Sequence, residues 1–257
     1  MNTKKAKLIA IFAMFCFLLM VSAQVLSETL TAKQIMKKAK EVQQVPASWS
    51  VAEETIITGG GSKRTFLIEM WTKDNSEKQL MIYKEPARVR GVKFLFLEDG
   101  DEIYTYFPKT DRVRHLASHM KRQKMMGSDF SYEDMTFGDI EEDYKSYKLL
   151  GSEEMEDVDC WVVEAIPSKS GPHYSKMIIR VQKSNFVTRR IDYYEDGDLR
   201  KRFKAERIEV IDGIPTPLDY EMKNLMDGGY TAFKTKEIKY DVSPSDVMFT
   251  TRNLKKR

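Results

Sequence analysis

Cysteine is almost absent from this chain. Of its 257 residues only Cys16 and Cys160 are cysteines, and Cys16 lies in an N-terminal stretch that we predict is removed. The mature chain would keep one cysteine and could form no intramolecular disulfide. An exported chain of this length without disulfides must depend on an ordinary hydrophobic core.

Long hydrophobic runs are also lacking, with one exception at the start. Three lysines (Lys4, Lys5 and Lys7) precede the apolar run 8–21, and Val21-Ser22-Ala23 offers a cleavage site of small residues. This pattern predicts a secretory signal peptide over residues 1–23, leaving 24–257 as a single domain in the periplasm. A membrane anchor is disfavoured because the run is short for a bilayer.

An excess of charge of one sign is missing once the signal is set aside. The precursor has 42 Lys and Arg against 39 Asp and Glu, and the predicted cleavage removes three lysines and no acid. The mature chain is therefore neutral by formal count. A neutral, exported chain is not expected to bind nucleic acid, although Lys121-Arg122 is locally basic.

Motifs for nucleophilic catalysis or phosphate binding are not found. Ser128 stands in Gly-Ser-Asp rather than in a Gly-x-Ser-x-Gly elbow, and Cys160 inside a strand-like run reads as a small buried hydrophobe. The glycines at 59–61 lack the Lys-Ser/Thr sequence of a phosphate loop. We therefore expect a protein that is not an enzyme and uses no cofactor.

Metal-binding patterns are weak. His115 and His119 have a spacing of four residues, but no Glu follows His115 as in the zinc proteases, and no third ligand is near. We interpret both as surface histidines and expect no metal site. His173, in a Gly-Pro-His loop, is expected to be solvated.

Strand-like runs separated by turn signals make up most of the chain. They recur about every 8 to 12 residues, which predicts an all-β sandwich or barrel of about eleven strands. A helix is expected from Thr31, whose capping box with Gln34 precedes an apolar stripe, until Pro46. A second short helix is expected over 118–126, ended by Gly127.

Several runs, such as 158–166 and 175–182, carry apolar residues on both faces. A strand with one face in solvent should alternate between apolar and polar residues, so both faces of these strands are expected to be covered.

A motif rich in polar residues lies near the middle of the chain and reads as a structured loop. Its two rings are expected to press into an apolar surface, and Asp129 and Ser131 to fix the loop by bonding its backbone. The motif residues are Gly127, Ser128, Asp129, Phe130, Ser131, Tyr132, Glu133, Asp134 and Met135.

This motif, with the run 103–108 and Arg112-Val113-Arg114 before it, resembles the outer-membrane lipoprotein-sorting (LolA-like) proteins. Gly213-Ile214-Pro215, Val247-Met248-Phe249 and Leu254 are also similar, so the resemblance runs from about residue 71 to the end. The central motif is the part of the resemblance that is specific to these proteins, whereas the strand pattern alone is not specific.

The resemblance implies a mainly β fold, an open and incomplete antiparallel barrel covered by an N-terminal helix and a central helical insertion, with an apolar cavity. It implies a periplasmic carrier of the acyl chains of lipids or lipoproteins between the inner and outer membranes. Its partners would be an inner-membrane lipid-exporting transporter and an outer-membrane acceptor. The segment 118–135 is the candidate lid. The expected cavity residues are Phe66, Ile68, Met70, Ile82, Phe94, Phe96, Met177, Ile179 and Met222.

Two alternatives stay open. The expected cavity residues could fill a solid core, and the protein could then be a structural or adaptor component of an envelope assembly. The identity of the cargo also stays open, because this chain is longer than the lipoprotein carrier proper and its motif belongs to a wider set of proteins.

Overall fold

A computed structural model describes residues 30–136 and 138–256, and Thr31–Arg257 form one compact unit. The predicted signal peptide and its cleavage site lie outside the described residues and stay a prediction. Within the described part, no helix has the length and apolarity needed to cross a bilayer.

The N-terminal helix α2 (Ala32–Glu41) begins as its sequence predicts. The Thr31 side chain accepts a hydrogen bond from the Gln34 backbone, and the Gln34 side chain accepts one from the Thr31 backbone. This reciprocal capping satisfies amide groups that the first helical turn leaves free. Ala32, Ile35, Met36 and Ala39 form the buried face of the helix.

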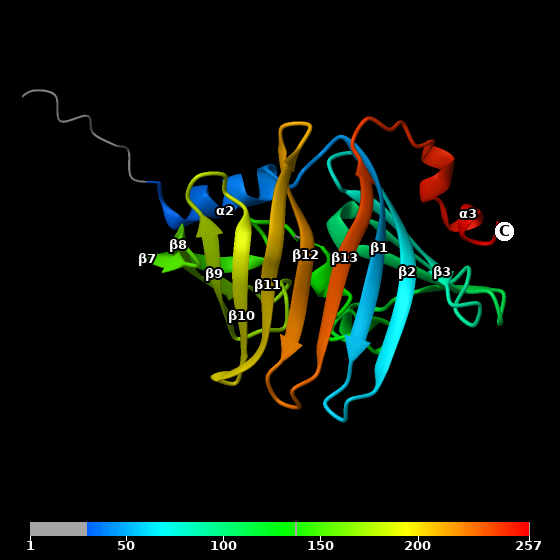
Figure 1. Cartoon of the computed structure of the whole chain (residues 1–257), viewed down its shortest axis with the longest axis horizontal. Helices are drawn as coiled ribbons and strands as arrows, with labels where there is room; N and C mark the ends of the chain where they lie inside the picture. Colours follow the sequence, from blue (N-terminus) through cyan, green and yellow to red (C-terminus); the bar gives the residue numbers. More distant parts are fainter. Residues whose placement is uncertain (1–29, 137, 257) are drawn as a thin grey trace, which may run out of the picture. The chain divides into compact units, whose positions relative to one another are not determined.

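In the described part of the chain, thirteen antiparallel strands form a single open sheet, which confirms the predicted fold class (Figure 1). Two more strands are present than expected. The edge strands β6 and β7 are mostly exposed. The strands are β1 (Ala47–Ile57), β2 (Lys63–Lys73), β3 (Lys78–Glu85), β4 (Lys93–Leu97), β5 (Glu102–Phe107), β6 (Arg112–His115), β7 (Tyr144–Met155), β8 (Val158–Pro167), β9 (Lys176–Gln182), β10 (Thr188–Glu195), β11 (Asp198–Ile211), β12 (Ile214–Asn224) and β13 (Tyr230–Lys239).

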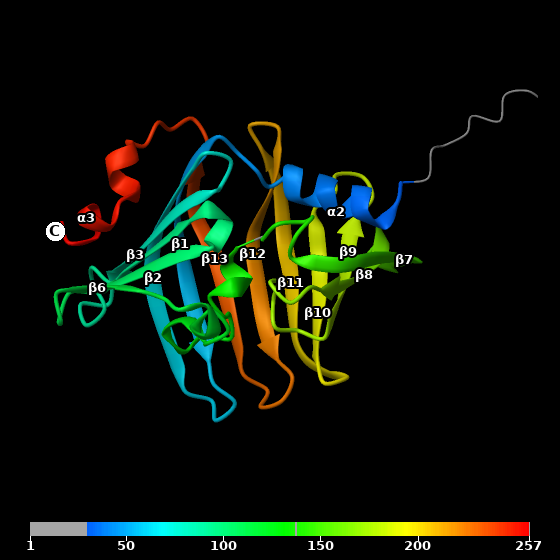
Figure 2. The ribbon, with the colours of Figure 1, turned by 180° about the vertical axis from the view of Figure 1, so that it is seen from behind.

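The strand order explains where the chain between β6 and β7 must run. Strands β1 to β6 lead outward to one edge, β7 to β13 lead back from the other edge, and β1 pairs with β13 in the centre. The connection between the two edges, residues 116–143, therefore crosses one face of the sheet (Figure 2). We call residues 116–143 the crossing segment and the face that it covers the inner face.

Among the described residues of the crossing segment, helical structure is limited to three 3-10 turns: η2 (Ser118–Met120), η3 (Met125–Gly127) and η4 (Glu133–Met135). The single helix expected over 118–126 is wrong. Met126 and Gly127 have φ values of 52° and 77°, which an α-helix does not accept. Lys124 instead forms an isolated β-bridge with Ser131, so the chain folds back on itself here.

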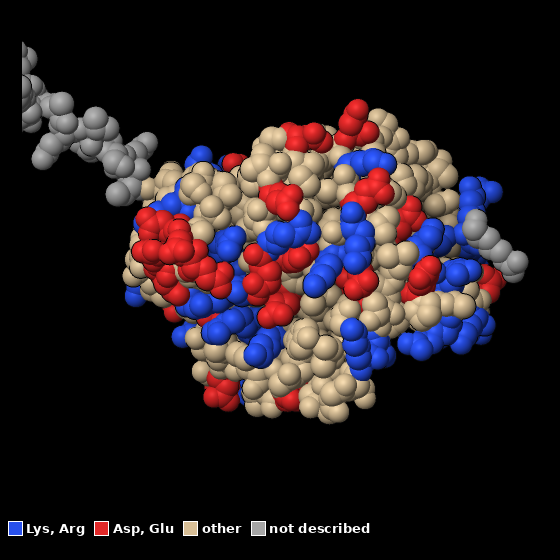
Figure 3. Space-filling model, in the orientation of Figure 1, with Lys and Arg blue, Asp and Glu red and all other residues tan. Residues whose placement is uncertain are grey.

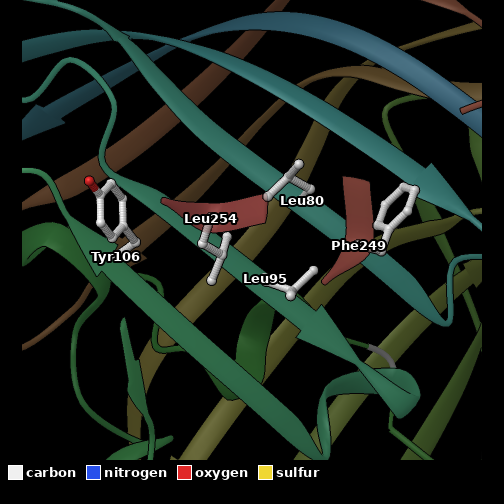
Figure 4. Close-up of a cluster of buried hydrophobic side chains, with 5 residues drawn as sticks. All are labelled: Leu80, Leu95, Tyr106, Phe249 and Leu254. Atoms are coloured by element: carbon white, nitrogen blue, oxygen red, sulfur yellow. The ribbon is translucent and has the colours of Figure 1, made fainter. Parts of the chain in front are cut away.

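The outer face is covered at one end by the C-terminal elements η5 (Asp246–Phe249) and α3 (Thr251–Leu254). Their Phe249 and Leu254 pack on strand residues to form a buried cluster (Figure 4). The cluster consists of Leu80, Leu95, Tyr106, Phe249 and Leu254. On the inner face, α2 packs against β7 and β9. The helix α2 thus covers part of the inner face beside β9, whereas the outer-face cover lies over β3 and β4, so two-sided cover of the runs 158–166 and 175–182 stays a prediction.

Candidate functional site

The central motif is anchored to the inner face at Asp129. The Asp129 backbone N–H donates to the Thr231 hydroxyl of β13 at 2.8 Å, and that hydroxyl donates to the Asp129 carboxylate at 3.0 Å. Lys124 adds an ion pair to the same carboxylate at 2.9 Å. Asp129 therefore fixes the loop to a strand, whereas Ser131 acts within the loop by donating its hydroxyl to Asp134.

The two rings of the motif pack into the sheet. Phe130 contacts Phe233 edge-on with ring centroids 5.3 Å apart, and Tyr132 lies 5.8 Å from Phe94. Both motif rings are buried, at 3% and 8% exposed. Such aromatic pairs contribute about 0.5–1.5 kcal/mol each beyond the area that they bury. The expectation that these rings meet an apolar surface is confirmed.

Asp134 is a buried polar hub at the end of the motif. Its carboxylate accepts hydrogen bonds from the Ser131 backbone and hydroxyl, and from the Tyr174 hydroxyl at 2.9 Å. It also pairs with the Lys201 ammonium of β11. Lys201 in turn lies over the rings of Tyr174 and Tyr193, 5.0 and 5.2 Å from their centroids. The hub joins the crossing segment, the sheet and the loop before β9.

A second buried carboxyl, Glu54, lies on the central strand β1. Glu54 is 0% exposed, and Tyr83 donates a hydrogen bond to one of its oxygens at 2.9 Å. The other oxygen has no hydrogen-bond partner among the described residues. Burial raises the pKa of Glu54 to about 7, against the lowering effects of the Tyr83 hydrogen bond and the Arg64 charge.

A cavity of about 570 Å³ remains between the crossing segment, α2 and the loop 169–174. Strands β9 and β10 form its floor, and residues of α2, which packs against β9, also line it. This volume is within the roughly 300–1,000 Å³ range of small-molecule sites. Its apolar lining is Met36, Ala39, Ile140, Tyr144, Met177, Ile179, Ile191 and Tyr193.

The rim of the cavity is charged, with both signs present. Lys40 pairs with Asp99 at 2.8 Å and donates to the Gly138 carbonyl, so its charge is already matched. Arg122 and Lys169 are exposed and form no ion pair within the described residues. The site thus combines an apolar floor with two free cations at its rim.

His173 lies at one side of the rim and is exposed, as expected. Its ring contacts Glu133 of the crossing segment through Nδ1 and Glu195 of β10 through Nε2 at 2.9 Å. Burial lowers the pKa of His173, but the hydrogen bonds and charges of Glu133 and Glu195 outweigh burial and hold it above its usual value. The two other histidines share no helix: His115 ends β6 beside Glu102, and His119 lies in η2 at the rim.

Of the nine residues predicted to line the cavity, only two do so in the structure. Met177 and Ile179 line the cavity. Five others are at most 3% exposed and lie outside its lining: Phe66, Ile68, Phe94, Phe96 and Met222. Met70 is half-buried. Ile82 packs against the outer cluster, on the face opposite to Tyr83 and Phe94. The role of these residues in binding stays a prediction.

Sequence reasoning missed six apolar lining residues: Met36, Ala39, Ile140, Tyr144, Ile191 and Tyr193. The apolar stripe of α2 did indicate that Met36 and Ala39 cover a surface. Nothing in the sequence of β10 by itself shows that its inner face stays partly uncovered, because that depends on where the crossing segment runs.

Comparisons with known proteins agree with the fold. The crystal structure of a DUF1329 family protein from Desulfovibrio piger has a TM-score of 0.80 and 28% identity, covering 87% of this chain and 97% of that one. An outer membrane lipoprotein-sorting protein domain from Vibrio parahaemolyticus has a TM-score of 0.80 and 23% identity, covering 88% and 98%. A LolA superfamily protein from Nitrosomonas europaea has a TM-score of 0.70 and 24% identity, covering 87% and 99%.

No curated protein matches the sequence. A protein-family model described as "Uncharacterized protein" matches residues 75–256, which include the central motif and every strand from β3 to β13. This match covers more than half of the chain, so the chain belongs to the family that this model describes, and it shares its fold with the lipoprotein-sorting domain and the LolA superfamily protein.

Proposed function

We propose that this protein is a periplasmic, non-enzymatic carrier that binds the acyl chains of lipids or lipoproteins and moves them between the inner and outer membranes. The observation that carries the proposal is the cavity of about 570 Å³ with an apolar floor on β9 and β10. Sorting proteins and LolA-superfamily proteins with the same fold support it. The inner-membrane transporter and outer-membrane acceptor are part of the proposal.

Burial of the acyl chain supplies most of the binding free energy. Each CH₂ group removed from water contributes about 0.8 kcal/mol, so a sixteen-carbon chain could gain on the order of 12 kcal/mol before ordering costs. A hydrogen bond to the head group contributes only about 0.5–1.5 kcal/mol. The carrier therefore selects for the tail, while Arg122 and Lys169 at the rim favour an anionic head group over a neutral one.

Filling the cavity with a larger side chain should weaken the binding of acyl chains. Ile191 is a half-buried lining residue of β10, so Ile191→Trp places an indole ring in the space that the tail would occupy. We expect the affinity for a fluorescent fatty acid, measured by titration, to fall at least tenfold. Val210→Trp, at a position of β11 that is 69% exposed and outside the cavity lining, is the matched control and should bind as the wild type does. Equal binding by both variants would contradict the proposed site.

The crossing segment is the proposed lid, because it forms one wall of the cavity and its motif covers the inner face beside it. Asp129 and Thr231 are in direct contact through short side chains, which suits an engineered disulfide. In a Cys160→Ala background, Asp129→Cys with Thr231→Cys would lock the segment to β13.

We expect lipid transfer between donor and acceptor vesicles to be at least fivefold slower for the oxidised double-cysteine variant than for the same variant after reduction. The comparison within one variant removes any effect of losing the Asp129 contacts. Undiminished transfer under oxidising conditions would show that the crossing segment need not move.

An adaptor with a filled core is the second candidate, and one observation favours it. Five of the nine predicted lining residues are fully packed rather than facing open space. Lipid-free protein that takes up no fatty acid would support the adaptor and exclude the carrier.

A further inference from the structure

A concentration of positive charge lies at the β3–β6 end of the sheet. Three segments contribute to it: the stretch 84–93 around the β3–β4 turn, the stretch 107–114 around the β5–β6 turn, and the C-terminal residues 252–256. They contain ten Lys and Arg residues and only two acids, Glu85 and Asp111. The ten are Lys84, Arg88, Arg90, Lys93, Lys109, Arg112, Arg114, Arg252, Lys255 and Lys256.

Printed contacts bring the three segments together. A Cβ placed on Gly91 would lie 3.1 Å from the Pro108 ring, so the β3–β4 and β5–β6 turns touch. The Lys93 ammonium donates to the Lys256 carbonyl at 2.6 Å, which holds the C-terminus against β4. Burial lowers the pKa of Lys93, and the charge of Lys84 lowers it further, so these two cations lie near each other. We call this group of ten cations the basic end.

Most of this charge is free. Nine of the ten cations are exposed and the tenth, Lys93, is half-buried. Among the described residues, only Lys84 forms an ion pair, with Glu69. The described residues have equal numbers of basic and acidic side chains, so an excess of cations here leaves an excess of acids elsewhere. Acidic side chains gather near β7 and β8, at the opposite edge of the sheet from β6, while blue side chains gather near β3 and the C-terminus (Figure 3).

We propose that the basic end is a docking surface for an anionic phospholipid bilayer. Phosphate head groups present a plane of negative charge, and exposed Lys and Arg side chains bind such a plane without a shaped pocket. The separation of basic and acidic regions orients the protein, because the acidic edge is repelled by the surface that attracts the basic end. Docking at this end is independent of acyl-chain uptake, since none of the ten cations lines the cavity.

Co-sedimentation with vesicles tests the proposal. The full mature chain should bind vesicles of 30% phosphatidylglycerol and 70% phosphatidylcholine but not vesicles of phosphatidylcholine alone. Binding should be lost in about 0.5 M salt, where screening shortens the range of the attraction to a few ångströms. Each cation near an anionic surface contributes roughly a fivefold change in binding.

The test variant combines Arg88→Gln, Lys109→Gln, Arg112→Gln and Arg114→Gln, four exposed cations with no hydrogen bond or ion pair to other described side chains. We expect its binding to anionic vesicles to fall about 100-fold or more. The matched control, Lys145→Gln with Lys148→Gln, Lys223→Gln and Lys234→Gln, removes four exposed charges from β7, β12 and β13. It should change binding by less than about threefold.

Three outcomes would overturn the proposal. The wild type could fail to bind anionic vesicles, in which case an acidic protein is the better partner for this surface. It could bind neutral vesicles equally well, or the two quadruple variants could lose binding equally. Fatty-acid uptake by the basic-end variant should equal that of the wild type, so failure of the docking surface is distinguishable from failure of the carrier function.

Discussion

Replacing Asp134 by asparagine should destabilise the protein by about 3–5 kcal/mol, because it leaves the Lys201 ammonium buried without its counter-ion. The Asp134 and Lys201 side chains are only 1% and 14% exposed, so water cannot replace the lost charge. For a domain of this size, the loss corresponds to a fall in Tm on the order of 10 °C. Thermal unfolding followed by circular dichroism measures it.

Two controls separate the charge from other effects of the substitution. Asp134→Asn with Lys201→Met removes both charges and should recover at least half of the lost Tm, since no unpaired charge then remains buried. Asp198→Asn breaks an exposed pair with Arg200 and should change stability by less than about 1 kcal/mol. A fall in Tm for Asp198→Asn as large as for Asp134→Asn would contradict the role of the buried hub.

Glu54 should make stability depend on pH, in the direction opposite to most carboxyl groups. Its pKa is about 7 in the folded protein against 4.5 for the ordinary value. Between these two values the folded state binds more protons than the unfolded state, so stability falls as pH rises from about 4.5 to about 7 and then levels off. The shift corresponds to about 3 kcal/mol of stability missing at pH 8.

Glu54→Gln should therefore flatten this pH dependence and raise the free energy of unfolding at pH 8, as measured by urea denaturation across pH 4 to 8. The groups facing Glu54 are Tyr83, which donates to it, and the charge of Arg64; Tyr220 has a pKa raised mainly by burial and partly by Glu54. Glu53→Gln, at the neighbouring position of β1 whose side chain points to the other face, is the matched control and should keep the slope. An unchanged slope in Glu54→Gln would contradict the assignment.

Two local patterns predicted local structure correctly, whereas the helix expected over 118–126 did not form. The Thr31 and Gln34 capping box lies within four residues, and the predicted start of α2 is confirmed. The rings of Phe130 and Tyr132 were expected in an apolar surface because they alternate with polar loop residues, and the structure confirms this too.

Contacts across long sequence separations could not be read from the chain. The partners of Asp129 and Asp134 are Thr231 and Lys201, which the order of the strands alone brings to the motif. Ile82 was expected on the inner face from the alternation of side chains along its strand, but it lies on the outer face. A shift of one residue in that alternation moves a side chain to the opposite face of the sheet. The contacts of His173 with Glu133 and Glu195 could not be predicted, because no sequence pattern near His173 indicates them.

The lipid content of the purified protein tests the carrier function most directly. Mass spectrometry of organic extracts should detect acyl lipid from the wild type, at an amount approaching one molecule per protein, and little from Ile191→Trp. A wild-type protein that yields no lipid and takes up no added fatty acid would contradict the central claim that the cavity on β9 and β10 holds an acyl chain.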